Sequence, residues 1–298
     1  MVVVEVHAVL PTFIIGLREG LEAALIVGIV AAFLAQQGRK DALRQVWFGV
    51  ALAVAICLAV GVILKIVSAD LPQQGQERLE TVIAVVAVAM VTYMVVWMRS
   101  HSKHLKGDLE TAAASALAQN STKALVLMAF LAVMREGFET VVFLLAAFNA
   151  SGNAAASGTG ALLGIVVAVI GGYFIFKGGL KVNLSRFFRV TGLVLVVIAA
   201  GLVMSAFHTG HEAGWVTAGQ TQMFDLTWFV RPGSVISSLV TGVLGIQPFP
   251  TQIEVYAWAL YLVPMVLVVC WPQRRRAQSA PVPARSQPLP SSLPRVHS

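Results

Sequence analysis

The sequence predicts an all-α integral membrane protein with seven transmembrane helices. Two observations carry this fold class. Hydrophobic residues make up 57% of the 298-residue chain and charged residues only 12%, about half of the charged share that is usual in soluble domains. Several uncharged apolar runs also exceed the roughly 18 residues that a helix needs to cross a bilayer.

Seven apolar segments are expected to cross the membrane. Each should be an α-helix, because backbone groups in lipid must be satisfied within their own segment. The segments cover residues 9–34, 46–67, 81–98, 124–149, 160–176, 188–207 and 253–271. They form one membrane domain over residues 1–272, whose repeat halves are about 8–98 and 123–208. Residues 273–298 are rich in Pro, Ser and Arg and are predicted to be a disordered cytoplasmic tail.

Positive charge predicts the orientation of these segments. Most of the 21 Lys and Arg residues follow the first, third and fifth segments or lie in the tail, whereas the other side holds only Lys65, Arg78 and Arg231. Basic loops stay in the cytoplasm, so the N-terminus is expected outside and the C-terminus inside. Acidic residues favour the outer side, where they would attract cations.

One charged motif occurs twice inside apolar segments. REGLE covers residues 18–22 in the first segment, and REGFE covers residues 135–139 in the fourth. On a helix, the arginine and two glutamates of each copy share a wedge of about 100°. An ionisable group at this depth costs roughly 2.5–3.5 kcal/mol, so the charges should face one another or a watery cavity. They are Arg18, Glu19, Glu22, Arg135, Glu136 and Glu139.

The two motifs predict an inverted repeat with a binding site at its centre. Three segments form each repeat unit, so the second unit enters the membrane in the opposite sense, and a seventh helix follows. Inverted repeats place their substrate site near the bilayer midplane, where the halves meet. Four carboxylates against two guanidinium groups would attract a hard cation. Gly20 and Gly137 beside the wedges allow close helix approach.

Several other interpretations of the motifs remain open. The charges can be structural Arg–Glu pairs, although these leave Glu19 and Glu136 without a matched partner in their own helix. The glutamates can also form a proton relay. A membrane-embedded carboxylate metalloenzyme is a further class, but no segment carries Glu-x-x-His or His-Glu-x-x-His. A membrane anchor for other proteins leaves the buried charge unexplained.

A second group of polar residues lies near the predicted outer face. Glu77 and Glu80 precede the third apolar segment, where they either meet an incoming cation or complement a helix N-terminus. A histidine and glutamate group follows the sixth segment. We take Trp97 and Glu254 as residues of the membrane–water interface. The candidate outer access site comprises Glu77, Glu80, His208, His211 and Glu212.

Both motifs resemble the paired R-E-x-x-E motifs of the oxidase-dependent iron permease family, of fungal high-affinity and bacterial type. The resemblance extends over about residues 8–272. It includes LETVIAVVAVAMVTYMVVWM at residues 79–98 and HEAG at residues 211–214. Phe138 stands where the first copy has leucine.

This resemblance implies an iron permease of the bacterial inner membrane, and not an enzyme. Iron, ferric in the family's usual account, would pass from periplasm to cytoplasm as a substrate, with no permanently bound cofactor. Implied partners are a periplasmic iron-binding protein and a haem peroxidase. Nucleic acid is not expected, because no basic face with interleaved aromatic residues occurs outside the loops. An alternative is a proton-coupled carrier of another divalent metal such as manganese. The implied metal-handling residues are Glu19, Glu22, Glu136 and Glu139, supported by Arg18 and Arg135.

Overall fold

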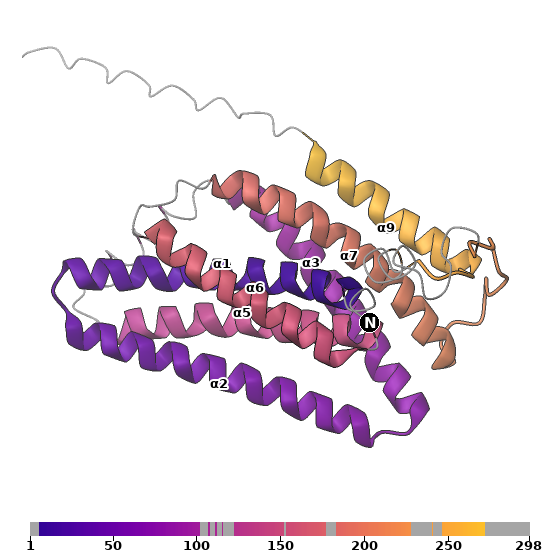
Figure 1. The fold of residues 1–298 in the computed structure, drawn as a ribbon, viewed down its shortest axis with the longest axis horizontal. Coiled ribbons are helices and arrows are strands. Elements are labelled where there is room, and N and C mark those ends of the chain that lie inside the picture. The colour runs from indigo at the N-terminus through magenta and orange to yellow at the C-terminus, as the bar shows by residue number, and fades with distance from the viewer. Residues whose placement is uncertain are drawn as a thin grey trace, which may run out of the picture.

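Seven α-helices make up the described part of the computed structural model (Figure 1). That part covers residues 6–101, 122–151, 153–176, 183–227 and 246–271, with residues 107, 111, 115 and 240. The predicted tail at residues 273–298 lies outside it. The helices are α1 (Val6–Gln36), α2 (Lys40–Asp70), α3 (Gln73–His101), α5 (Thr122–Ser151), α6 (Ala154–Phe176), α7 (Leu184–Glu212) and α9 (Gln252–Cys270).

All seven predicted segments are confirmed as helices. Most run past their predicted ends, because apolar sequence marks only the part of a helix that lipid or protein covers. In the described residues, α2, α3, α6, α7 and α9 are long and apolar enough to cross a membrane. The helices α1 and α5, which carry the motifs, are 31 and 30 residues long. The architecture is that of a multi-pass membrane protein.

The helices pack in pairs. α1 packs along α6, α2 along α5, and α3 along α7, while α1 and α5 also contact each other. In Figure 1, α2 lies along one edge of the bundle and α9 along the opposite edge, beside α7. α9 is also joined to α3, because the hydroxyl oxygens of Thr92 and Tyr261 lie 2.9 Å apart. Arg99 of α3 donates to carbonyl groups at the end of α9.

Small residues allow α1 and α6 to approach closely. A Cβ atom added at Gly16 of α1 would lie 2.5 Å from the carbonyl oxygen of Ala161. One added at Gly164 of α6 would meet the carbonyl oxygen of Phe13. In membranes such packing is a main source of helix association, since lipid is as apolar as the side chains it replaces. The small face of α6 consists of Gly160, Gly164, Ala168 and Gly172.

Both motif glycines lie at such close contacts, as the sequence predicts. A Cβ at Gly20 would lie 2.9 Å from the Cβ of Ala168 on α6, and one at Gly137 would lie 2.7 Å from the Sγ of Cys57 on α2. Each motif helix therefore packs its glycine against a small residue of a neighbouring helix. This contact fixes the helix at the level of its charged residues.

We expect Gly164→Ala to destabilise the fold by about 1–3 kcal/mol, because the added methyl group must displace the α1 backbone. The measurement is thermal unfolding of the detergent-purified protein. Gly158→Ala in the same helix is the matched control, since a Cβ there meets nothing within 4 Å. Both variants gain similar helix propensity, so equal melting temperatures for the two would contradict the packing argument.

Candidate metal-binding site

The motif carboxylates gather where α1 and α5 meet. Glu19 is 1% exposed, Glu22 is 3% exposed and Glu136 is 4% exposed. One carboxylate oxygen from each of these three residues lies within 4.8 Å of the others, and no other three His, Cys, Asp or Glu residues in the described part of the chain gather in this way. We call these three residues the carboxylate triad. It brings together residues that are more than 110 positions apart in the sequence.

Arg18 is the cation inside this cluster. It is 1% exposed, and its Nη1 lies 2.6 Å from Oε1 of Glu19 while its Nη2 lies 3.6 Å from Oε2 of Glu22. Its Nη1 also contacts the sulfur of Met94 on α3. The prediction that Glu19 lacks a partner in its own helix is therefore wrong, because the arginine side chain is long enough to turn back to its immediate neighbour.

Arg135 has a different environment although its motif is nearly identical. Its side chain is 44% exposed, and its Nε lies 3.0 Å from Oε1 of Glu139 and 3.9 Å from Glu136. The guanidinium carbon lies 5.4 Å from the ring centroid of Trp97, a cation–π distance. Trp97, predicted as an interface residue, thus holds Arg135 together with Glu139. Glu136 lies farther from Arg135 than Glu139 does and belongs to the triad.

Four buried polar atoms of the motifs have no hydrogen-bond partner. They are Nε of Arg18 and the Oε2 atoms of Glu19, Glu22 and Glu139. Buried polar atoms are nearly always hydrogen-bonded in proteins, and carboxylate oxygens are the preferred ligands of hard cations. Glu139 is the one motif glutamate outside the triad, but its Oε2 is among these atoms. The three triad glutamates outnumber their one buried arginine, so the centre suits an additional cation.

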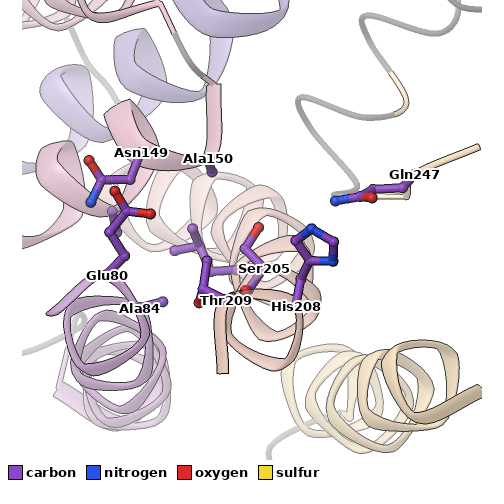
Figure 2. Close-up of a pocket in the computed structure, with 10 residues that line it drawn as sticks. Glu80, Ala84, Asn149, Ala150, Ser205, His208, Thr209 and Gln247 are labelled. Atoms are coloured by element: carbon purple, nitrogen blue, oxygen red, sulfur yellow. Dashed lines mark hydrogen bonds between the residues drawn. The ribbon is translucent and has the colours of Figure 1, made fainter. Parts of the chain in front are cut away.

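A separate pocket of about 120 Å³ lies at the candidate access site (Figure 2). Of the five predicted residues, Glu80 and His208 line this pocket. Glu212 joins them through its Oε1, which lies 3.6 Å from Nε2 of His208. In Figure 2, Glu80 lies beside Asn149, across the pocket from His208. The remaining lining residues are Ala84, Ala146, Ala150, Leu202, Ser205, Thr209 and Gln247.

The two other predicted access residues have local partners. Oε1 of Glu77 accepts a hydrogen bond from Gln73 at 3.1 Å, and Nδ1 of His211 lies 2.7 Å from the carbonyl oxygen of Val216. α3 begins at Gln73, and its first turn holds no acidic residue. Glu77 and Glu80 therefore do not act at the helix N-terminus, which was the alternative explanation for them.

Glu254 has a role that its place in the sequence did not predict. It was expected at the membrane–water interface, but it is 3% exposed. Its Oε1 lies 3.1 Å from Nδ1 of His208, and its Oε2 accepts from the backbone N–H of Thr251 at 2.9 Å. The T-x-x-E pattern of a capping box is visible in the sequence. The contact with His208 depends on the packing of α9 against α7.

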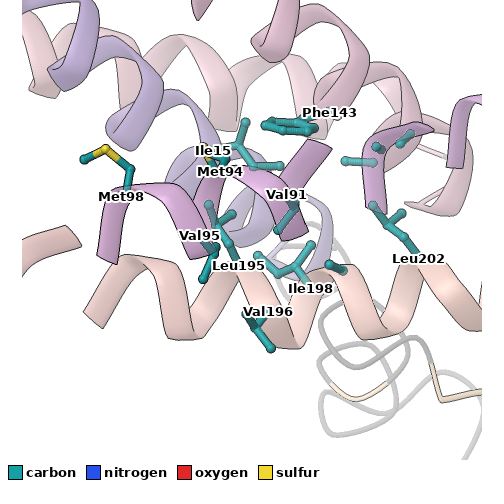
Figure 3. Close-up of a cluster of buried hydrophobic side chains, with 14 of the residues drawn as sticks. Ile15, Val91, Met94, Val95, Met98, Phe143, Leu195, Val196, Ile198 and Leu202 are labelled. Atoms are coloured by element: carbon teal, nitrogen blue, oxygen red, sulfur yellow. The ribbon is translucent and has the colours of Figure 1, made fainter. Parts of the chain in front are cut away.

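An apolar layer separates this pocket from the carboxylate triad. Ala146 of the pocket follows Glu139 by seven residues on α5, about 10 Å along the helix. Phe143 lies between them and is 1% exposed. It belongs to a buried cluster that includes Ile15 and Val91 and reaches Met94, the contact of Arg18 (Figure 3). The chain thus holds two polar sites with apolar packing between them.

Comparisons with a family model and with individual proteins point to the same family. Residues 9–274 match the family described as Iron permease FTR1 family. The chain is 42% identical over 275 residues to "Ferrous iron permease EfeU" of Yersinia pestis, covering 92% of this chain and 97% of that protein. It is 40% identical over 270 residues to the proteins of that name from Shigella sonnei and Escherichia coli O157:H7, covering 90% of this chain and 98% of each. No solved structure matches the chain.

Proposed function

Because this chain belongs to the iron permease FTR1 family, we propose that it imports iron across the bacterial inner membrane through its paired R-E-x-x-E motifs. The chain is a transporter and not an enzyme, and iron is its transported substrate. The observation that carries the proposed route is the carboxylate triad, which combines oxygens from both motif helices. Glu139, with its unpartnered buried Oε2, is the fourth iron-handling residue.

We propose that the chain is an inverted repeat of α1–α3 and α5–α7, followed by α9. The helix pairing supports this. In such a repeat α1 corresponds to α5, α2 to α6 and α3 to α7. The α1–α6 contact then corresponds to the α5–α2 contact, and both contacts are extensive. The α3–α7 and α1–α5 contacts each correspond to themselves. With the N-terminus outside, as the basic loops favour, the pocket around Glu80 and His208 faces the periplasm.

In the proposed route, iron meets the outer access residues first and the motif carboxylates second. Glu77, Glu80, His208 and Glu212 supply negative charge and ligand atoms at the outer ends of α3 and α7. The apolar layer at Phe143 must then open before the ion reaches the triad. A periplasmic iron-binding protein and a haem peroxidase, implied by the family resemblance, would deliver iron to this face.

Ferric iron is the form that we propose for the transported ion. An all-oxygen site with excess negative charge favours hard, highly charged cations. The relatives at 40–42% identity carry the name ferrous iron permease, so the oxidation state must be tested directly. The same ligand chemistry suits manganese, which is the substrate of the alternative proton-coupled carrier.

The test is uptake of radiolabelled iron into proteoliposomes that contain this chain alone. We expect uptake from ferric citrate to exceed uptake from ferrous iron kept reduced with ascorbate, and both to exceed uptake of manganese. Liposomes without protein provide the background. Faster manganese uptake that depends on a proton gradient would favour the alternative carrier. Faster ferrous uptake would retain the permease and correct the oxidation state.

A further inference from the structure

His208 is oriented by a buried carboxylate. Its Nδ1 lies 3.1 Å from Oε1 of Glu254, whose side chain is only 4% exposed. A carboxylate accepts hydrogen bonds, so Nδ1 must carry the hydrogen. Glu254 is itself fixed by the backbone N–H of Thr251. This carboxylate–histidine pair is the arrangement that orients metal-binding histidines, and it leaves the lone pair of Nε2 free to bind.

The free nitrogen faces a second ligand. Nε2 of His208 lies 3.6 Å from Oε1 of Glu212, one turn later on α7. A tetrahedral ion with bond lengths of 2.0–2.1 Å holds two ligand atoms about 3.4 Å apart, so the observed separation needs almost no adjustment. The two side chains are 40% and 45% exposed, which leaves room for water ligands. The pocket beside His208 adds the oxygens of Glu80, Asn149 and Ser205 on its walls.

We propose that His208 and Glu212 form an outer metal site that selects transition-metal ions over Ca²⁺ and Mg²⁺, with Glu254 as a positioning residue. Imidazole nitrogen binds first-row transition metals well, whereas Ca²⁺ and Mg²⁺ take oxygen ligands. The carboxylate triad offers oxygen alone and discriminates less. The role of the His208–Glu212 site in selecting the transported ion rests on the proposed function. Metal binding at His208 does not depend on that function.

The same contacts have a purely structural explanation. A protonated His208 would pair with Glu212 and Glu254 at once and join the end of α7 to α9. That arrangement places hydrogens on both ring nitrogens and binds no metal. The two explanations therefore differ in metal binding, and not in the contacts themselves.

The experiment measures Co²⁺ binding at neutral pH in the full chain carrying Glu22→Gln and Glu136→Gln, which removes the triad. Equilibrium dialysis and the visible absorption of Co²⁺ report binding at His208. We expect one bound ion, and a loss of affinity of at least tenfold on adding His208→Ala or Glu212→Gln. Glu212 is exposed, so its variant tests the site even if His208→Ala does not fold. Undiminished binding in both variants would overturn the proposal.

Two further variants test whether Glu254 positions His208 or only stabilises the fold, and whether the metal binds at His208. Glu254→Gln keeps an oxygen acceptor for Nδ1 but removes its charge, so we expect affinity to fall 10–100-fold and the Co²⁺ absorption to change, with a similar melting temperature. A melting temperature that falls while affinity is unchanged would make Glu254 merely structural. Asp225→Asn is the matched control for Glu212→Gln, because Asp225 is an exposed acid that does not line the pocket, and its binding should equal that of the parent. Binding lost there would place the site elsewhere.

Selectivity is measured in proteoliposomes with the motifs intact. Excess Ca²⁺ and Mg²⁺ should leave iron uptake by the unmodified chain unchanged and lower uptake by His208→Ala about tenfold, because without the imidazole nitrogen the remaining oxygen ligands also accept these ions. Equal resistance in both proteins would overturn the selective role while uptake itself stands. If Co²⁺ binds at His208 but the chain transports no iron, the metal site stands and only the proposed function is refuted.

Discussion

Glu22→Gln and Glu139→Gln are each expected to lower iron uptake by about 100-fold, while the protein stays folded. Each change removes one negative charge and keeps nearly the same shape. Both residues carry a buried Oε2 atom without a hydrogen-bond partner, so the replaced oxygen is one that an ion would use. Loss of a charged ligand contact of about 3 kcal/mol corresponds to about 100-fold in affinity.

The measurement compares initial rates of radiolabelled iron uptake into proteoliposomes at matched protein content. Asp70→Asn provides the control, since it removes an exposed acid at the end of α2 by the same chemical change. Its uptake should equal that of the unmodified chain. If both glutamine variants transport iron normally, the motifs are structural Arg–Glu pairs. The route would then be sought around Glu77, Glu80 and His208.

The meeting of the two motifs could be predicted because it follows from simple constraints. Helical periodicity places the charges of each copy on one wedge, and lipid is too costly an environment for them. The charged wedges therefore face each other inside the protein, and Glu19, Glu22 and Glu136 lie close together there. The length of the apolar segments predicted the seven helices in the same way.

The difference between Arg18 and Arg135 could not be predicted from the motif. Both arginines precede a Glu-Gly pair and lie near the middle of their helices. Their environments are set by α3, which offers the sulfur of Met94 to the first arginine and the ring of Trp97 to the second. These residues are three positions apart on one helix, and only the packing of α3 decides which arginine each one meets.

The pocket around Glu80 and His208 shows the same limit. The T-x-x-E pattern at Thr251 and Glu254 indicates a helix start, and α9 does begin there. A capping glutamate is normally exposed, so nothing in the local sequence suggests that Glu254 is buried. Its burial follows from the contact of α9 with α7, which brings it to His208, 46 residues earlier in the chain.

Arg18→Met is expected to destabilise the protein by about 3–5 kcal/mol, the cost of removing one partner from a buried ion pair. The variant leaves three buried glutamates without their internal cation. Arg135→Met should cost about 1 kcal/mol, because its side chain is 44% exposed and a half-exposed pair contributes little. The measurement is thermal unfolding of both variants in metal-free buffer. Similar losses of stability in the two variants would contradict the difference in burial between the two arginines.

Bound metal ions should restore the stability that the Arg18→Met variant loses. Arg18 contacts oxygens of Glu19 and Glu22, two of the three residues that would bind the ion, so arginine and metal compete for the same charge. Added Mn²⁺ or Co²⁺ should therefore raise the melting temperature of Arg18→Met more than that of the unmodified chain. Tighter binding also slows release, because the guanidinium group no longer replaces the departing ion. We thus expect Arg18→Met to bind metal more strongly and to transport iron more slowly, whereas a purely structural arginine would leave metal affinity unchanged.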